Sequence, residues 1–264
     1  MAAAGILMLV ALLVVACQKE QTVGEDVPAG MKKLNVFLTD DPSLVFDSIF
    51  IDIRMLEVKV ERTNGTEFWD TLPIRAGVYN ILKFRNGVDT LLTAAYIPNG
   101  EVKKIRLTLG TQNSVMKHGN IFPLSLHNNN RQVIIDIPDV DHIDPNTFAI
   151  WIDFDGHGSI IRLRDNVFEL RPRIHCFSNS HGGRIEGEIK PRAALPAIVK
   201  VIAGTDTLLA VTDNDDGDFK IRGIRSSTVK LIVIPSNGYR DSIINNIQLS
   251  PGRDTKLGDI VVHQ

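Results

Sequence analysis

The sequence predicts an all-β protein built from two β-sandwich domains. Polar and apolar residues alternate over many short segments, which is the pattern of half-buried strands. Turn-forming pairs such as Asn64-Gly65 and Asn99-Gly100 separate these segments. The length of 264 residues exceeds one average domain, and 44% hydrophobic with 23% charged residues is typical of chains that form a core.

Five segments of the first half show the alternation of strands. They are residues 34–38, 49–53, 58–60, 105–109 and 148–154. Only residues 89–96, which read DTLLTAAY, favour a helical turn or two. The polar segment 178–183 then interrupts the pattern, and we expect it to be a linker that proteases cut. We assign the first domain to residues 31–177.

Seven short strands are expected in the second half. They cover residues 184–189, 197–203, 207–212, 218–221, 228–234, 243–248 and 256–262. Strands that recur about every 8–12 residues are typical of a sandwich. We assign the second domain to residues 183–264.

The N-terminal residues predict export. Residues 6–16 form an uncharged run of about 11 residues, within the ~7–15 of a signal-peptide core and short of the ~20 that span a bilayer. The run ends at Cys17 in VVAC, which resembles the bacterial lipobox, whose cysteine receives diacylglycerol. We expect a signal peptide at residues 1–16 and a lipidated tether at 17–30; the alternative is a short buried helix. Residues 1–5 carry no Lys or Arg, so we expect the natural start upstream.

Composition narrows the classes of partner. A net charge of -2 gives no basic footprint for nucleic acid, and we exclude that class. If Cys17 carries lipid, Cys176 is the remaining thiol, so the mature chain has no intramolecular disulfide. We expect Cys176 to be a small buried residue.

The second half resembles the carboxypeptidase regulatory-like, prealbumin-like (transthyretin-like) domains of exported Bacteroidetes proteins. The resemblance lies in GRIEGEI, in AVTDNDDGDFKIRGI and in the closing GYRDSIINNIQLSPGRDTKLGDIVV. It implies a sandwich that acts as a spacer or binding module without catalysis.

Residues 31–177 resemble the domain of unknown function 4382 family, also found on exported lipoproteins. The residues that carry this include Leu38-Thr39-Asp40, the strand at 48–60, Ile105-Arg106-Leu107, Asp153-Phe154-Asp155 and residues 170–174, LRPRI. The chain has Gly158 where the family commonly has a lysine. Because the family has no assigned activity, the resemblance implies architecture.

Asp153 and Asp155 form a candidate metal site. They lie two apart on an expected strand, so both point to one face, and two close carboxylates need a positive partner. That partner is Ca²⁺ with Asp40 as third ligand, or the guanidinium of Arg106 or Arg173. The other alternative is that both carboxylates are simply solvated.

Two other motifs have structural alternatives. Residues 213–218, DNDDGD, depart from a calcium loop because Gly217 falls where a ligand should be, so we favour a hairpin turn over a weak calcium site. Asp155, His157 and Ser159 contain the letters of a catalytic triad, but G-x-S-x-G is absent. We assign no catalytic residue.

The motif Asp-(Ser/Thr)-aliphatic occurs five times. It resembles the O-glycosylation sequon of exported Bacteroidetes proteins, and the acceptors would be Ser48, Thr71, Thr90, Thr207 and Ser242. The alternative is strand-entry chemistry, in which a turn-forming Asp precedes β-formers.

We expect an exported lipoprotein of the cell envelope. Its lipid would anchor it in the outer membrane. Its role would be binding, adhesion or accessory, with a glycan or protein partner and no cofactor besides the candidate Ca²⁺. The alternative is a carbohydrate-active enzyme or enzyme subunit. A cleft with converging carboxylates of perturbed pKa favours the enzyme, whereas a shallow apolar patch favours the binder.

Overall fold

The prediction of an all-β fold is confirmed. The structure is a computed structural model that describes residues 27–41, 45–137, 147–178 and 182–264. Within these ranges it has twenty strands, no α-helix and three short 3₁₀ helices, η1 (Ile81–Phe84), η2 (His127–Asn129) and η3 (Arg192–Ala194). The predicted signal peptide and Cys17 lie outside the described residues.

Two sheets form the N-terminal body, which is the described part of residues 27–178. The smaller sheet has the order β13-β10-β1-β5. Its strands are β1 (Met31–Asp41), β5 (Thr90–Pro98), β10 (Thr147–Asp155) and β13 (Ile174–Ser178). Strands β1 and β10 are parallel, whereas β5 and β13 pair antiparallel at the edges.

The larger sheet has nine strands in the order β11-β12-β8-β7-β2-β6-β9, with β3 and β4 also paired to β2. The strands are β2 (Ser48–Glu61), β3 (Glu67–Leu72), β4 (Gly77–Asn80), β6 (Glu101–Leu109), β7 (Ser114–Lys117), β8 (Asn120–Leu126), β9 (Gln132–Asp136), β11 (Ile160–Arg164) and β12 (Val167–Leu170). The long strand β2 is therefore the centre of this sheet.

The alternating residues form the core between these sheets. Leu34, Val36 and Leu38 of β1 are fully buried, as are Ile150 and Ile152 of β10. Burial of these side chains is the main stabilising contribution, at about 1.5–3 kcal/mol for each fully buried Leu, Ile or Val.

The helical turn expected at residues 89–96 is wrong. These residues lie largely in β5, which pairs with β1 from Met31 to Leu38. A register shift between Val36 and Phe37 marks a β-bulge there. The bulge interrupts the alternation in β5, so that Leu92 and Ala95 are both buried, a spacing that is typical of a helix.

A sandwich forms the C-terminal body, residues 182–264, and all seven expected strands are present. They are β14 (Gly183–Lys190), β15 (Ile198–Ala203), β16 (Asp206–Val211), β17 (Asp218–Ile224), β18 (Thr228–Ile234), β19 (Ser242–Gln248) and β20 (Asp254–Val261). The sheets β17-β14-β20 and β16-β15-β18-β19 enclose a second core, with Phe219 and Leu231 among its buried residues.

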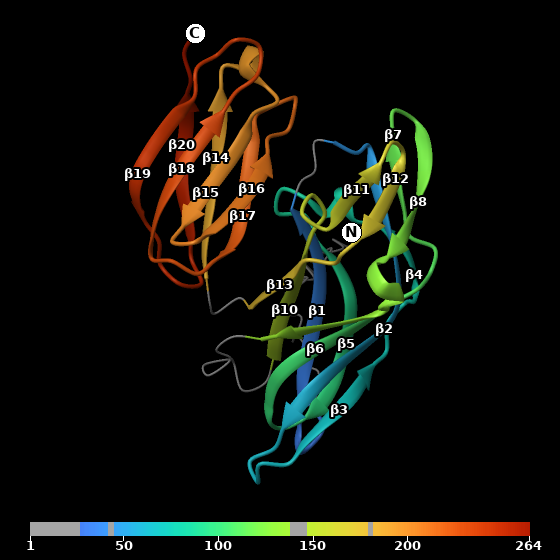
Figure 1. Cartoon of the computed structure of the whole chain (residues 1–264). Coiled ribbons are helices and arrows are strands. Elements are labelled where there is room, and N and C mark those ends of the chain that lie inside the picture. Colours follow the sequence, from blue (N-terminus) through green and yellow to red (C-terminus); the bar gives the residue numbers. More distant parts are fainter. Residues whose placement is uncertain (1–26, 42–44, 138–146, 179–181) are drawn as a thin grey trace, which may run out of the picture.

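The two bodies have separate cores and share no sheet (Figure 1). The chain passes from β13 to β14 at the expected linker, of which residues 179–181 lie outside the described ranges. That each body is an independent folding domain stays a prediction, which limited proteolysis within residues 178–183 tests.

Candidate functional site: the interface between the two bodies

The outer face of the four-stranded sheet is covered by the C-terminal body. Phe37 of β1, Trp151 of β10 and Phe177 of β13 form a continuous stack on this face. The ring centroids of Phe37 and Trp151 are 4.9 Å apart, and those of Trp151 and Phe177 are 5.7 Å apart. Trp151 is 8% exposed. Stacked aromatic rings of this size bury a large apolar area, so this face of the sheet is a contact surface for another part of the protein.

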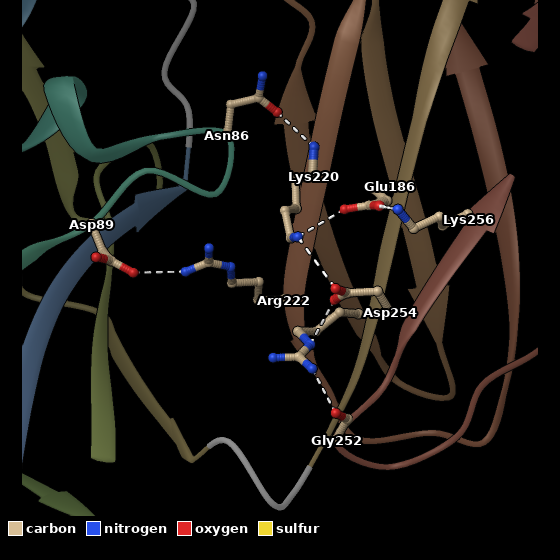
Figure 2. Close-up of polar contacts among 9 residues, drawn as sticks. Asn86, Asp89, Glu186, Lys220, Arg222, Gly252, Asp254 and Lys256 are labelled. Carbon is tan, nitrogen blue, oxygen red and sulfur yellow. Dashed lines mark hydrogen bonds and ion pairs between the residues drawn. The ribbon is translucent and has the colours of Figure 1, made fainter. Parts of the chain in front are cut away.

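Strand β17 provides the opposing surface. Its sequence DFKIRGI alternates, so that Phe219 and Ile221 enter the core of the C-terminal body. Lys220 and Arg222 lie on the other face, next to the N-terminal body, and Figure 2 shows Arg222 reaching Asp89. The Asp89 carboxylate accepts hydrogen bonds from the Arg222 guanidinium at 2.7 Å and from the Trp151 indole at 2.8 Å. One carboxylate therefore ties the aromatic stack to the second body.

Asn86 contacts the backbone of β17. Its Nδ2 donates to the Asp218 carbonyl at 3.0 Å. Its Oδ1 accepts from the Lys220 amide at 2.7 Å, as Figure 2 shows. The side-chain amide thus satisfies one backbone donor and one acceptor of an edge strand, as a neighbouring strand would. Asn86 holds a left-handed conformation with φ 59°, which Asn tolerates better than most residues.

Close backbone approach fixes the distance between the bodies. A Cβ atom at Gly223 would lie 2.7 Å from the Phe177 ring, and one at Gly87 would lie 2.9 Å from the Lys220 side chain. Both glycines have positive φ, 73° and 78°. Each body therefore contributes a glycine onto which a side chain of the other body packs.

Ion pairs behind β17 position its lysine. The Lys220 ammonium lies 2.7 Å from Glu186, which also pairs with Lys256 at 3.1 Å (Figure 2). The hydrogen bond from Lys220, followed by that from Lys256, lowers the pKa of Glu186 below its usual value. Arg184 pairs with Asp254 at 2.8 Å beside this group. The network holds the aliphatic stem of Lys220 over Gly87.

A polar pocket of about 320 Å³ opens beside this interface. The N-terminal body contributes Asp153, Asp155 and Arg173, and the C-terminal body contributes Asp206, Thr207 and Arg225. This volume is at the lower end of the ~300–1,000 Å³ of small-molecule sites. Sites of this kind commonly lie between domains, so this pocket is the candidate binding site.

Asp153 is the buried acidic residue of the pocket. It is 7% exposed, and its Oδ1 has no hydrogen-bond partner among the described residues. Burial, and to a smaller extent the neighbouring Asp155, raises the pKa of Asp153 to about 7. Asp155 accepts a hydrogen bond from the Gly158 amide at 2.6 Å. The two carboxyl groups line the same pocket, as their spacing on the strand predicts.

The expected calcium site with Asp40 is wrong. In the pairing of β1 with β10, Asp40 lies opposite Phe154, so its side chain is on the other face of the sheet from Asp153. Asp40 instead accepts a hydrogen bond from the Gly156 amide at 3.0 Å in the interior. No three His, Cys, Asp or Glu side chains in the described ranges are grouped to hold a metal ion.

The two arginines expected as alternative partners of Asp153 and Asp155 lie in different places. Arg106 forms a bidentate pair with Glu57 on the larger sheet and stacks on Trp69. Arg173 lines the pocket beside Asp153 and Asp155. Arg173 is thus the arginine that lies near the acidic pair, although no ion pair joins it to either carboxylate among the described residues.

Residues 213–218 form a turn, but not a hairpin. They connect β16 and β17, which belong to different sheets. The Asp213 amide donates to the Asp218 carbonyl at 3.2 Å, and Gly217 has φ 87°. Asp215 pairs on the surface with Arg192 at 2.6 Å. The expectation of a hairpin is wrong, because the turn leads the chain from one sheet of the sandwich to the other and the two strands do not pair with each other.

Ser159 and Cys176 have structural roles. The Ser159 hydroxyl accepts from the Arg173 amide at 2.8 Å, and its side chain is fully buried. Cys176 is 1% exposed, and burial raises the pKa of its thiol well above the usual value. The expectation of a buried Cys176 is confirmed.

The expected glycosylation acceptors differ in exposure. Ser48 is 6% exposed and accepts a hydrogen bond from the Asn80 amide at 3.0 Å, so it cannot carry a glycan in the folded chain. Thr71 and Thr207 are exposed, whereas Thr90 and Ser242 are half-buried at the first positions of β5 and β19. Glycosylation of the four accessible residues stays a prediction.

The contact residues of the interface were missed in the sequence. They are Asn86, Gly87, Asp89, Lys220, Arg222 and Gly223. The sequence did contain a signal for this interface. Phe37, Trp151 and Phe177 lie in β1, β10 and β13 next to residues that face the core, so these three rings point to the outer face of the sheet. Aromatic residues on both faces of a sheet indicate that both faces are covered.

The family of this protein is identified from the sequence of its N-terminal body. A family model described as Domain of unknown function (DUF4382) matches residues 32–172, which is more than half of the chain. This protein belongs to that family. The DUF4382 region contains Asp89, Trp151 and Asp153, while β13 and the C-terminal body lie outside the match. The likeness of the C-terminal body to carboxypeptidase regulatory-like domains stays a prediction.

Three solved structures share a distant likeness with this DUF4382 protein. The Bacillus anthracis TIE protein aligns over 88% of this chain at 11% identity and TM-score 0.22, and this chain spans 34% of that protein. A mutant of the shaft pilin spaA from Lactobacillus rhamnosus GG aligns at 8% identity and TM-score 0.20, covering 88% of this chain and 97% of that one. The major pilin (T-13) of Streptococcus pyogenes serotype GAS131465 aligns at 7% identity and TM-score 0.15, over 89% and 98%. Scores this low support no inference about this chain.

Comparison with curated protein sequences gives no significant match. Among the described residues, none belongs to a helix with the length and apolar character needed to span a membrane.

Proposed function

We propose that this protein is a non-catalytic binding module that a lipid on Cys17 holds at the bacterial cell envelope. The observation that carries the binding role is the interface, where two β bodies are fixed to one another and contribute residues to one polar pocket. A fixed pair of sandwiches presents a preformed pocket, and preformed sites bind without the cost of ordering. The uncharged run before Cys17 supports the envelope location.

Cys17→Ser should release the protein from membranes into the soluble exported fraction. The acyl chains on a lipidated cysteine supply most of the membrane affinity of such a protein, because each buried CH₂ contributes about 0.8 kcal/mol. Fractionation of cells that express the wild type and the variant, followed by immunoblotting, measures the shift. Cys176→Ser is the matched control and should leave membrane retention unchanged. Full retention of the Cys17→Ser protein would show that lipid is not the anchor.

The binding role is tested with the chain from residue 27 onward, which lacks the predicted signal peptide and lipid. We expect it to bind at least one glycan or peptide class on an array of envelope polysaccharides and cell-wall fragments. We expect the bound polymers to keep their length, as measured by mass spectrometry. Absence of binding to every class would overturn the role as a binding module.

A carbohydrate-active enzyme is the second candidate, and Asp153 favours it. A carboxyl that keeps its proton near neutral pH beside a second carboxyl is the arrangement of acid–base pairs in glycoside hydrolases. An enzyme would shorten a polysaccharide in the same assay, and Asp153→Asn would stop the shortening. That result would replace the module with the enzyme.

A further inference from the structure

We propose that the pocket between the two bodies binds a carboxylated sugar unit, with its hydroxyl groups on Asp153 and Asp155 and its carboxylate on Arg173 and Arg225. This inference rests on the proposed binding role and names the ligand class. It is carried by the distribution of charge and burial in the pocket.

The composition of the pocket excludes simple ions. Asp153, Asp155 and Asp206 would repel an anion, while Arg173 and Arg225 would repel a metal ion or a simple ammonium group. In the described part of the chain, neither of these two guanidinium groups has an ion-pair partner. A ligand that satisfies the pocket must therefore offer hydrogen-bond donors and a negative charge at separate positions.

The Asp153 carboxyl and the two guanidinium groups lie at different depths. Asp153 is buried at 7% exposure, whereas Arg173 and Arg225 are exposed. The Asp153 Oδ1, which is buried and has no partner among the described residues, needs a donor that the protein does not supply. A sugar hydroxyl is such a donor, and it can also accept a hydrogen bond from the protonated form of this carboxyl. A carboxylate on the outer side of the ring would then meet the guanidinium groups at the rim.

The pocket has the size and the apolar surface that a sugar ring requires. Its volume of about 320 Å³ accommodates one ring with space for water. Phe177 and Leu208 provide apolar surface in the wall, and Thr207 provides a further hydroxyl. Hydroxyl-rich ligands combine polar edges with an apolar ring face, which matches this wall.

Calorimetric titration of the chain from residue 27 onward tests the proposal, with sodium glucuronate and galacturonate as probes. We expect both to bind, and we expect glucose and galactose to bind about tenfold more weakly because they lack the carboxylate. Arg225→Gln should weaken glucuronate binding about tenfold while leaving glucose binding unchanged. Arg192→Gln, which removes an exposed arginine away from the pocket, is the matched control and should have no effect.

The outcomes separate this inference from the proposed role. Absence of uronate binding, equal affinity for neutral sugars, or equal binding by the Arg225→Gln chain would each overturn the carboxylated-sugar assignment. Stronger binding of glycine or lysine than of glucuronate would also overturn it, in favour of a zwitterionic ligand. If the chain fails with uronates but binds another class on the envelope array, only the ligand assignment fails and the binding role stands.

Discussion

Asp153→Asn is expected to stabilise the protein at pH 8 and to leave its stability at pH 4 almost unchanged. Burial raises the pKa of Asp153 to about 7, whereas the pKa of an aspartate in the unfolded chain is near its ordinary value of 3.8. Between these values the unfolded chain loses the proton while the folded chain keeps it. Stability therefore falls as pH rises through this window, and it is constant above the folded-state pKa.

The magnitude follows from the width of the window. About 3 pH units at about 1.4 kcal/mol per unit amounts to about 4 kcal/mol lost between pH 4 and pH 7. The side chain is almost fully buried, so solvent screens little of this effect. The groups lining the pocket are Asp155, Arg173 and His175 on the N-terminal body and Asp206, Arg222 and Arg225 on the C-terminal body.

Urea unfolding of both proteins at pH 4, 6 and 8 measures this difference. The free energy of unfolding of the Asp153→Asn chain, relative to wild type, should increase steadily over the series. Asp215→Asn, which changes an exposed carboxyl on the surface turn, should give a flat series. A flat series for Asp153→Asn as well would mean that Asp153 ionises in the folded chain as it does in water.

Alternation predicted the all-β class and the core-facing side of several strands, although it missed strand β5. Residues 148, 150, 152 and 154 were expected to face one side, and the structure buries all four between the sheets. The same rule placed Asp153 and Asp155 together on the opposite face. These inferences hold because side-chain direction in a strand depends only on the parity of the residue.

Contacts between distant strands could not be predicted in this way. Whether Asp40 faces Asp153 or Phe154 depends on the register of β1 against β10, and a slip of one residue exchanges the faces. Asp52 shows the same limit. It is fully buried because Gly110 approaches it and Arg54 pairs with it at 2.6 Å, yet its polar position in β2 predicts exposure.

The contact between the two bodies depends on the absence of a side chain at Gly223. Gly223→Ala should open the contact between the two bodies, because the added methyl group would lie 2.7 Å from the Phe177 ring. Two penalties combine at this position. An L-residue with φ 73° costs about 1–2 kcal/mol, and overpacking of a filled contact costs about 1–3 kcal/mol more.

Gly258→Ala separates these penalties. Gly258 lies in β20 of the same sheet with φ 64°, and a Cβ atom there meets nothing within 4 Å. In both variants an alanine must adopt a positive φ, which lowers stability, but only Gly223→Ala disturbs the interface. The excess loss of unfolding free energy in Gly223→Ala over Gly258→Ala is therefore the collision with Phe177, and we expect about 1–3 kcal/mol.

Trp151 fluorescence reports whether this loss arises at the interface. The Trp151 indole stacks between Phe37 and Phe177 and donates to Asp89, so separation of the bodies exposes it to water. In a Trp69→Phe background, where Trp151 is the remaining tryptophan, Gly223→Ala should shift its emission to longer wavelength and Gly258→Ala should not. Equal losses of stability with unchanged emission would show that the close approach of Gly223 to Phe177 does not hold the bodies together. In that case the pocket would not be preformed, and uronate binding would have to supply the cost of closing it.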